Sequence, residues 1–168
     1  MPTDNKTTVP NKFLKPGKVQ TIKGSILTPH YGGLRFVLNI ANMAGKVDDP
    51  IYKVFNKKWP KIKIDTRSWW ATKTGLGTGA YKMGSIRDLA VQSDIWAITM
   101  LARDENLELD LAGLQKCLKE VCKMAKYEKA TVACSTILTD EIPELVDLLK
   151  QELVNQGVSV SFYEEPSV

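Results

Sequence analysis

The sequence has few of the residues that bind metals or form disulfides. Its 168 residues include one histidine and three cysteines. The cysteines form no C-x-x-C pair, and Cys117 and Cys122 lie in a segment with helical periodicity. We therefore expect reduced thiols packed in the interior, no metal site and no cofactor.

Long hydrophobic runs are missing as well. No apolar segment approaches the roughly 20 residues that a helix needs to cross a membrane. The N-terminal sequence MPTDNKTTVPNK lacks the hydrophobic core of a signal peptide. These two absences predict a protein of the cytoplasm that makes no membrane contact. The net charge of +4 permits an anionic ligand but does not by itself favour nucleic acid.

The chain does contain enough apolar material for one domain. A hydrophobic content of 43% over 168 residues suits a single core rather than two. Residues 1–16 are polar and show no hydrophobic period, which predicts a flexible N-terminal arm. Residues 17–168 are expected to form a single α/β domain.

Apolar runs and amphipathic segments alternate along this domain. The continuous run LRFVLNIA is typical of a strand that is covered on both faces. The segment DLAGLQKCLKEVCKMAKYE has apolar residues at helical spacing. Strands are expected at 18–24, 34–41, 93–102, 130–138 and 158–165. Helices are expected at 48–59, 110–128 and 141–157. The glycine-rich segment 60–86 is expected to contain a loop and one or two strands. This alternation predicts an α/β three-layer sandwich, with a mixed, mainly parallel sheet and helices on both faces.

Polar residues gather where the second expected strand ends. In open α/β sheets the ligand site lies beyond the carboxyl ends of the strands. The amides of Asn39 and Asn42 can donate to and accept from sugar hydroxyls, and Asp48 can orient a water molecule. A simpler interpretation is that Asn42 ends the strand in a turn and Asp48 caps the next helix.

Three short segments resemble the macro domain family. Gly24-Ser25-Ile26, Leu38-Asn39-Ile40-Ala41-Asn42 and Gly45-Lys46-Val47-Asp48 are similar to its G-D-I, V-N-A-A-N and G-V-D segments, at about the same spacing. The resemblance covers roughly residues 19–163 and extends to small stand-alone macro proteins of tailed bacteriophages. It implies a cleft for ADP-ribose or a related nucleotide.

The resemblance also implies roles for individual residues. Asn42 would stand at the distal ribose. Asp48 would activate water, as in those members that hydrolyse ADP-ribosyl esters or the terminal phosphate of ADP-ribose 1''-phosphate. These two are the expected catalytic residues. The expected ligand-binding residues are Gly24, Ser25, Ile26, Asn39, Gly45, Lys46, Val47, Ser135 and Thr136.

The ligand loops depart from the family pattern. Ser25 stands where the family has an aspartate that accepts a hydrogen bond from adenine, so adenine selectivity should be weaker. Only Gly45 remains of the first glycine-rich loop. The second loop, STILTDEIPE, has no glycine and carries three carboxylates, which either repel a pyrophosphate or form a helix N-terminal charge cluster. These departures predict weak or altered ADP-ribose chemistry.

A second hypothesis is a degenerate macro fold without enzymatic activity. Lysines and tryptophans interleave in and after NKKWPKIK, a combination that binds single-stranded nucleic acid or a protein partner. The opposing interpretation is that the tryptophan rings are buried while the lysines stay solvated. The residues of this alternative surface are Lys57, Lys58, Lys61, Lys63, Trp69 and Trp70.

Two further motifs are expected to be unremarkable. GLGTG, residues 75–79, lacks the lysine of a phosphate-binding P-loop and is interpreted as a turn. His30 lies in a loop sequence without a nucleophile at a defensible spacing, so we expect a surface histidine.

Overall fold

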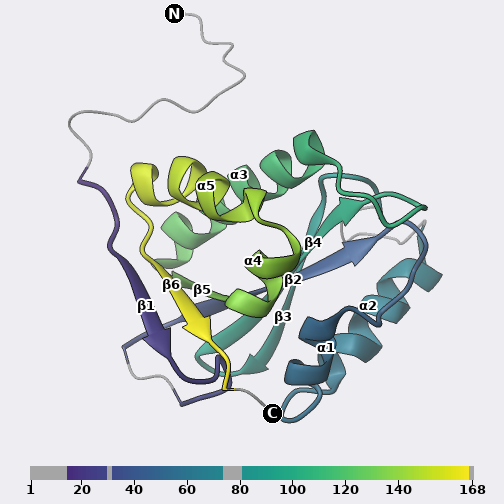
Figure 1. Cartoon of the computed structure of the whole chain (residues 1–168), viewed down its shortest axis with the longest axis horizontal. Helices are drawn as coiled ribbons and strands as arrows, with labels where there is room; N and C mark the ends of the chain where they lie inside the picture. Colours follow the sequence, from purple (N-terminus) through teal and green to yellow (C-terminus); the bar gives the residue numbers. More distant parts are fainter. Residues whose placement is uncertain (1–14, 30–31, 74–80, 167–168) are drawn as a thin grey trace, which may run out of the picture.

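A six-stranded sheet forms the centre of the molecule (Figure 1). The structure, a computed structural model, describes residues 15–29, 32–73 and 81–166. In spatial order the strands are β1 (Val19–Lys23), β6 (Val160–Glu164), β5 (Thr131–Ser135), β2 (Arg35–Asn42), β4 (Ile95–Arg103) and β3 (Ile86–Gln92). All neighbours are parallel except β3 and β4. The predicted mixed, mainly parallel sheet is confirmed.

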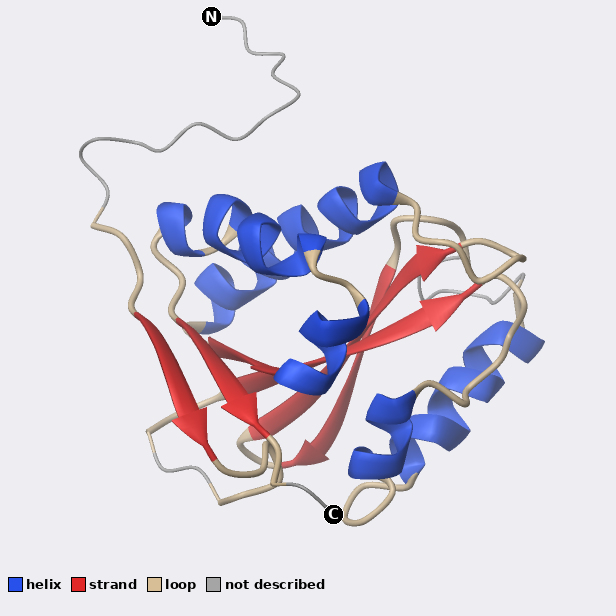
Figure 2. Ribbon diagram, viewed as in Figure 1, coloured by secondary structure: helices blue, strands red, loops and turns tan. Residues whose placement is uncertain are grey.

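Helices cover both faces of this sheet (Figure 2). α3 (Leu111–Glu128) and α5 (Glu144–Glu152) pack on one face, followed by the short helix η1 (Val154–Gln156). α1 (Pro50–Phe55) and α2 (Lys61–Ala71) lie on the other face, over β2, β4 and β3. α4 (Thr136–Glu141) follows β5 directly. The three-layer sandwich expected from the sequence is therefore correct.

Alternation along β2 explains how one strand supports two cores. All eight of its residues are buried. Phe36, Leu38 and Ile40 join the cluster with α3 and α5, whereas Val37 joins the cluster with α1. Successive side chains of a strand point to opposite faces, so a continuous apolar run supplies both cores at once.

The segment 60–86 differs from the sequence-based expectation. The prediction of strands there is wrong for residues 61–71, which form α2. Ile62, Thr66 and Trp69 recur at helical spacing and are buried, but the central threonine weakens the apolar pattern. Asp65 of α2 forms a two-bond ion pair with Arg87 of β3, with the Arg87 Nε atom 2.8 Å from Asp65 Oδ2. This contact fixes α2 against an edge strand.

Other boundaries also shift. The run at 130–138 divides into β5 and α4, and the segment at 141–157 divides into α5 and η1. The motif at 75–79 and His30 lie outside the described residues. No helix in the described part of the chain is long and apolar enough to span a bilayer.

Tyr52 connects α1 to the middle of β2, which yields a stability prediction. Its hydroxyl donates to the Ile40 carbonyl oxygen at 2.8 Å and accepts from Asn39 Nδ2 at 3.2 Å. Tyr52→Phe leaves two buried polar groups without this partner, so the free energy of unfolding should fall by about 1 to 3 kcal/mol. Urea denaturation measures the change. Tyr127→Phe is the control, because Tyr127 is 85% exposed; an equal loss in both variants would contradict the argument.

Candidate functional site

The carboxyl ends of the parallel strands bring together segments that are far apart in sequence. β1 leads into Gly24 and Ser25, β2 into the loop 43–49, and β5 into α4. The Gly24 amide donates to the Glu164 carbonyl oxygen at 3.1 Å, which joins the ends of β1 and β6. The segments that were predicted to form the site therefore lie along the side of the sheet where the parallel strands have their carboxyl ends. This side is called the carboxyl edge below.

Asn42 shapes the loop that follows β2. Its Oδ1 accepts from the amides of Ala44 (3.1 Å) and Lys46 (3.0 Å), and its Nδ2 donates to the Lys46 carbonyl oxygen at 3.0 Å. The side chain is buried. Tyr81 donates its hydroxyl to the Asn42 backbone carbonyl, and burial raises the pKa of Tyr81 to about 12. The geometry is that of a loop-forming amide, as the simpler interpretation of Asn42 proposed.

Gly45 makes a close contact that only glycine allows. Its φ of 74° lies in the left-handed region. A Cβ atom at this position would lie 2.3 Å from the Trp70 indole. Trp70 in turn donates its indole N–H to the Met43 carbonyl oxygen at 3.4 Å. The loop that contains Gly45 therefore packs directly against the last turn of α2, which carries Trp70.

A cation-lined cavity borders this loop. It has a volume of about 320 Å³ and is lined by Gly45, Lys46, Val47 and Asp48 together with Lys63 and Arg67 of α2. Asp48 is exposed and Val47 is buried. Three cations and one exposed carboxylate thus line the same cavity, a composition that suits an anionic ligand with a polar end.

A second cavity lies near the end of β1. It has a volume of about 370 Å³, and its lining includes Ser25, Val54, Lys57, Ile137 and Glu165. α1 begins just after the residues that line the first cavity and contributes Val54 to the second, which is also lined by Lys57 in the turn that follows α1.

Glu165 makes a contact at this second cavity that the sequence did not indicate. Its carboxylate accepts the backbone N–H of Ile26 at 2.7 Å. Ser25 Oγ accepts from the Leu27 amide at 3.1 Å. The backbone donor of Ile26, one of the predicted ligand-binding residues, is therefore occupied by a side chain of the protein itself.

The segment after β5 is helical rather than a ligand-wrapping loop. Ser135 is fully buried and accepts the Ile137 amide as the N-cap of α4. Thr136 donates its hydroxyl to the Tyr163 carbonyl oxygen at 3.2 Å. Both side chains, predicted as ligand contacts, have structural partners. Their contribution to binding stays a prediction.

The three carboxylates of this segment are divided between two helices. Asp140 and Glu141 end α4, and Glu144 lies in the first turn of α5. Only Glu144 fits the expected helix N-terminal cluster, where a negative charge complements the helix dipole.

A buried ion pair holds the beginning of α1. Asp49 occupies the N-cap position without capping the helix and instead accepts from Arg103 Nη1 at 3.0 Å. Burial raises the pKa of Asp49, Arg103 lowers it and Asp48 raises it. Burial also raises the pKa of Glu141, and Asp49 adds to that increase.

Several predicted residues lie away from both cavities. Asn39 is buried beneath α1, where its Nδ2 donates to Tyr52 and to Thr99 Oγ1. Trp69 is 2% exposed and packs edge-to-face on Tyr81, which agrees with the interpretation that the ring is buried and removes this residue from the alternative surface. Trp70 is half-buried, whereas Lys58 and Lys61 are exposed. Lys57 is also exposed but lines the second cavity.

The cysteines behave as the sequence predicts. Cys117, Cys122 and Cys134 are free and buried. Burial raises the pKa of Cys117 to about 12 and raises that of Cys134 further. Thiols of this kind are unreactive. Among the residues that the structure describes, no group of three histidine, cysteine or acidic side chains is placed to hold a metal ion.

Comparisons with known proteins find the fold but no sequence relative. No protein-family model matches the sequence, and no curated protein is significantly similar to it. A macrodomain protein from Streptomyces coelicolor superposes with a TM-score of 0.77 at 16% identity, covering 89% of this chain and 100% of that one. The macrodomain of Mycobacterium tuberculosis DarG gives a TM-score of 0.62 at 16% identity, covering 90% and 99%. The chain has a macro domain fold.

A third macro-fold structure contains a ligand. Thermosipho africanus DarTG, in complex with ADP-ribose, superposes with a TM-score of 0.57 at 10% identity, covering 77% of this chain and 38% of that one. The fold expected from the macro resemblance is thereby confirmed.

Three residues near the candidate site were not expected there from the sequence. They are Arg67, Arg103 and Glu165. Lys63 and Arg67 are four residues apart, so they share one helix face, but that signal exists only once α2 is known to be a helix. The contacts of Arg103 and Glu165 join strand ends to distant segments, and no local pattern indicates them.

The contact between Gly45 and Trp70 predicts a steric effect. Gly45→Ala should lower the free energy of unfolding by about 1 to 3 kcal/mol, because the added methyl group meets the indole and the residue keeps a strained φ. Chemical denaturation of Gly45→Ala, Trp70→Leu and the double variant separates the two causes. The double variant should lose less than the sum of the singles; strict additivity would exclude the clash.

The raised pKa of Asp49 predicts a pH dependence. A carboxyl group that binds its proton more tightly in the folded state contributes most to stability below its unfolded value of 3.8, and loses that contribution as pH rises through the folded pKa. Wild type should therefore lose stability relative to Asp49→Asn between about pH 3 and pH 7. Urea midpoints across that range test the sign. A gap that widens in favour of wild type would mean that Arg103 outweighs burial.

Proposed function

We propose that this macro fold binds ADP-ribose or a related nucleotide along the carboxyl edge of its sheet, in a cytoplasm. The presence of ADP-ribose in the structurally similar DarTG supports the class of ligand. The proposal depends mainly on one observation, the cavity at the loop 45–48 that is lined by Lys46, Lys63 and Arg67 together with Asp48.

The cations of this cavity suit the charged part of a nucleotide. Backbone N–H groups of a glycine-rich loop are the usual phosphate ligands in such a position. Here the loop has one glycine, and two side chains of α2 are available instead. Lysine and arginine bind phosphate as charged donors, so they can replace the missing backbone contacts.

The cavity at Ser25 is the proposed place for the base. Ser25 and the Ile26 amide offer neutral donors and acceptors, and Val54 and Ile137 supply apolar walls. A base that accepts from the Ile26 amide has to displace the Glu165 carboxylate, which lowers affinity. Weak base selectivity is therefore part of the proposal.

Hydrolysis by Asp48 is a second, narrower proposal. Asp48 is an exposed residue of this loop, and a carboxylate there can orient a water molecule. Asn42, the other predicted catalytic residue, already makes three hydrogen bonds within its loop. We propose that Asn42 contributes by holding the loop in shape.

The hydrogen bonds at the carboxyl ends of the strands also support the alternative proposal, a binding module without enzymatic activity. Ser135, Thr136, Asn42 and the Ile26 amide all have partners within the protein. Lys57, Lys58 and Lys61 are exposed near the α1–α2 turn and form the remaining part of the surface proposed for a protein or single-stranded nucleic acid.

Calorimetric titration with ADP-ribose tests the main proposal. Arg67→Gln and Lys63→Gln should each weaken binding by about fivefold, the effect of one partly solvated ion pair. Lys61→Gln is the matched control, because Lys61 is on the same helix but does not line the cavity. Equal affinity in all four proteins would remove the cation-lined cavity from the site, and no heat in wild type would favour the alternative.

Asp48→Asn separates binding from turnover. The variant should still bind ADP-ribose, and it should lose any release of phosphate from ADP-ribose 1''-phosphate that wild type shows. Turnover that persists in the variant would exclude Asp48 as the group that activates water.

A further inference from the structure

Arg35 is a buried cation without an acidic partner. It lies at the start of β2 and is 2% exposed. Its Nη1 donates to the Tyr163 hydroxyl at 3.1 Å, and its Nη2 donates to the carbonyl oxygens of Ile26 (3.1 Å) and Thr28 (3.4 Å). Its Nε is buried and makes no hydrogen bond. No Asp or Glu in the described part of the chain forms an ion pair with it. A charge buried in this way is costly unless an anion compensates it.

A cavity of about 760 Å³ lies against this arginine. It occupies the face of the sheet that carries α1 and α2, over β1, β6 and β5, where the described residues form no covering helix (Figure 2). Its lining includes two cations, Arg35 and Lys18, and no carboxylate. The formal charges of the lining side chains are therefore all positive.

Three hydroxyl groups in β6 and at the residue before it line the same cavity. Ser159, Ser161 and Tyr163 alternate along the chain, so they point to one side of the sheet. Each oxygen already accepts a hydrogen bond. Ser159 Oγ accepts from the Lys18 amide, Ser161 Oγ accepts from Gln20 Nε2, and the Tyr163 hydroxyl accepts from Arg35 Nη1. Because a hydroxyl donates one hydrogen as well, all three keep a donor for a ligand.

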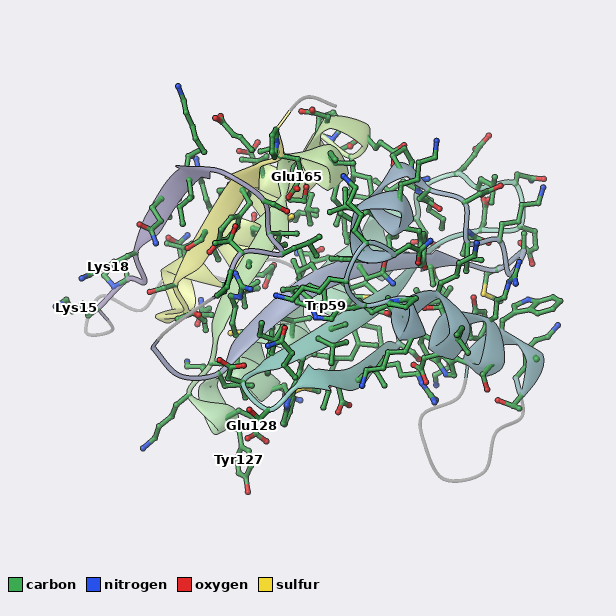
Figure 3. The ribbon with its side chains drawn as sticks, turned by 90° about the horizontal axis from the view of Figure 1, so that it is seen from below. Lys15, Lys18, Trp59, Tyr127, Glu128 and Glu165 are labelled. Atoms are coloured by element: carbon green, nitrogen blue, oxygen red, sulfur yellow. The ribbon has the colours of Figure 1, made fainter. Side chains whose placement is uncertain are left out.

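We propose that this cavity binds an oxyanion, the phosphate or carboxylate group of a small molecule, between Arg35 and the hydroxyls of Ser161 and Tyr163. Such a group supplies the charge that Arg35 lacks and accepts from the hydroxyl donors. This cavity shares no lining residue with the cavity at Ser25. Lys18, which precedes β1, and Glu165, which follows β6, mark the opposite ends of these paired strands (Figure 3).

Amide chemical shifts measured during titration with sodium phosphate, and separately with sodium acetate, test the proposal. The reference is sodium chloride at equal ionic strength. Saturable shifts should concentrate at residues 18–22, 131–132 and 159–163. Shifts confined to 45–48, or no saturable shift with either anion, would overturn it.

Variants identify the groups that hold the anion. Ser161→Ala removes one donor and leaves Arg35 intact, so it should weaken binding by about tenfold. Ser68→Ala on α2 is the control, because Ser68 is exposed and distant in the fold. Arg35→Gln should abolish saturable shifts. If that variant does not fold, the comparison of Ser161→Ala with Ser68→Ala decides, and equal affinities for the anion would refute the site.

Discussion

The complete burial of β2 is the constraint on which the rest of the structure depends. A strand at the centre of a parallel sheet, covered on both faces, has little access to water, so its polar side chains find their hydrogen-bond partners mainly inside the protein. β2 carries three such residues: Arg35 at its start, Asn39 in its middle and Asn42 at its end. Each one organises a different region. Arg35 holds the chain at Ile26 and Thr28, Asn39 holds Tyr52 of α1, and Asn42 holds the loop that follows the strand.

These contacts make the loop between β2 and α1 a preformed element. Asn42 fixes its beginning, Trp70 packs on Gly45 in its middle, and the Asp49–Arg103 pair with Tyr52 anchors its end. A loop held at three points loses little conformational freedom when a ligand binds, so more of the interaction energy appears as affinity. The same rigidity limits the loop's ability to close over a ligand.

The parts of the fold that could be predicted are those with a complete local pattern. β2 and α3 have continuous or strictly periodic apolar residues, and both were located from the sequence. α2 was missed because Thr66 occupies a buried position in its short apolar face. The end of β2 was predicted as part of the site, and the alternative of Asn42 as a turn residue describes its observed contacts. The row of hydroxyls beside Arg35 could not be foreseen, because β1, β6 and β2 meet only through the sheet order.

Replacement of backbone donors by side chains changes what such a site can recognise. Backbone N–H groups of a glycine-rich turn fix the positions of phosphate oxygens, whereas Lys63 and Arg67 act from a helix with long, partly solvated side chains. In the proposed binding mode, the charge of the ligand is therefore recognised more strongly than its geometry. Charge recognition by exposed cations is screened by salt, with a range of about 10 Å at 0.1 M ionic strength. In the same proposed mode, selectivity among nucleotides depends on the cavity at Ser25, where the Glu165 carboxylate already accepts the Ile26 amide. The site that we propose therefore favours anionic nucleotides as a class over ADP-ribose alone.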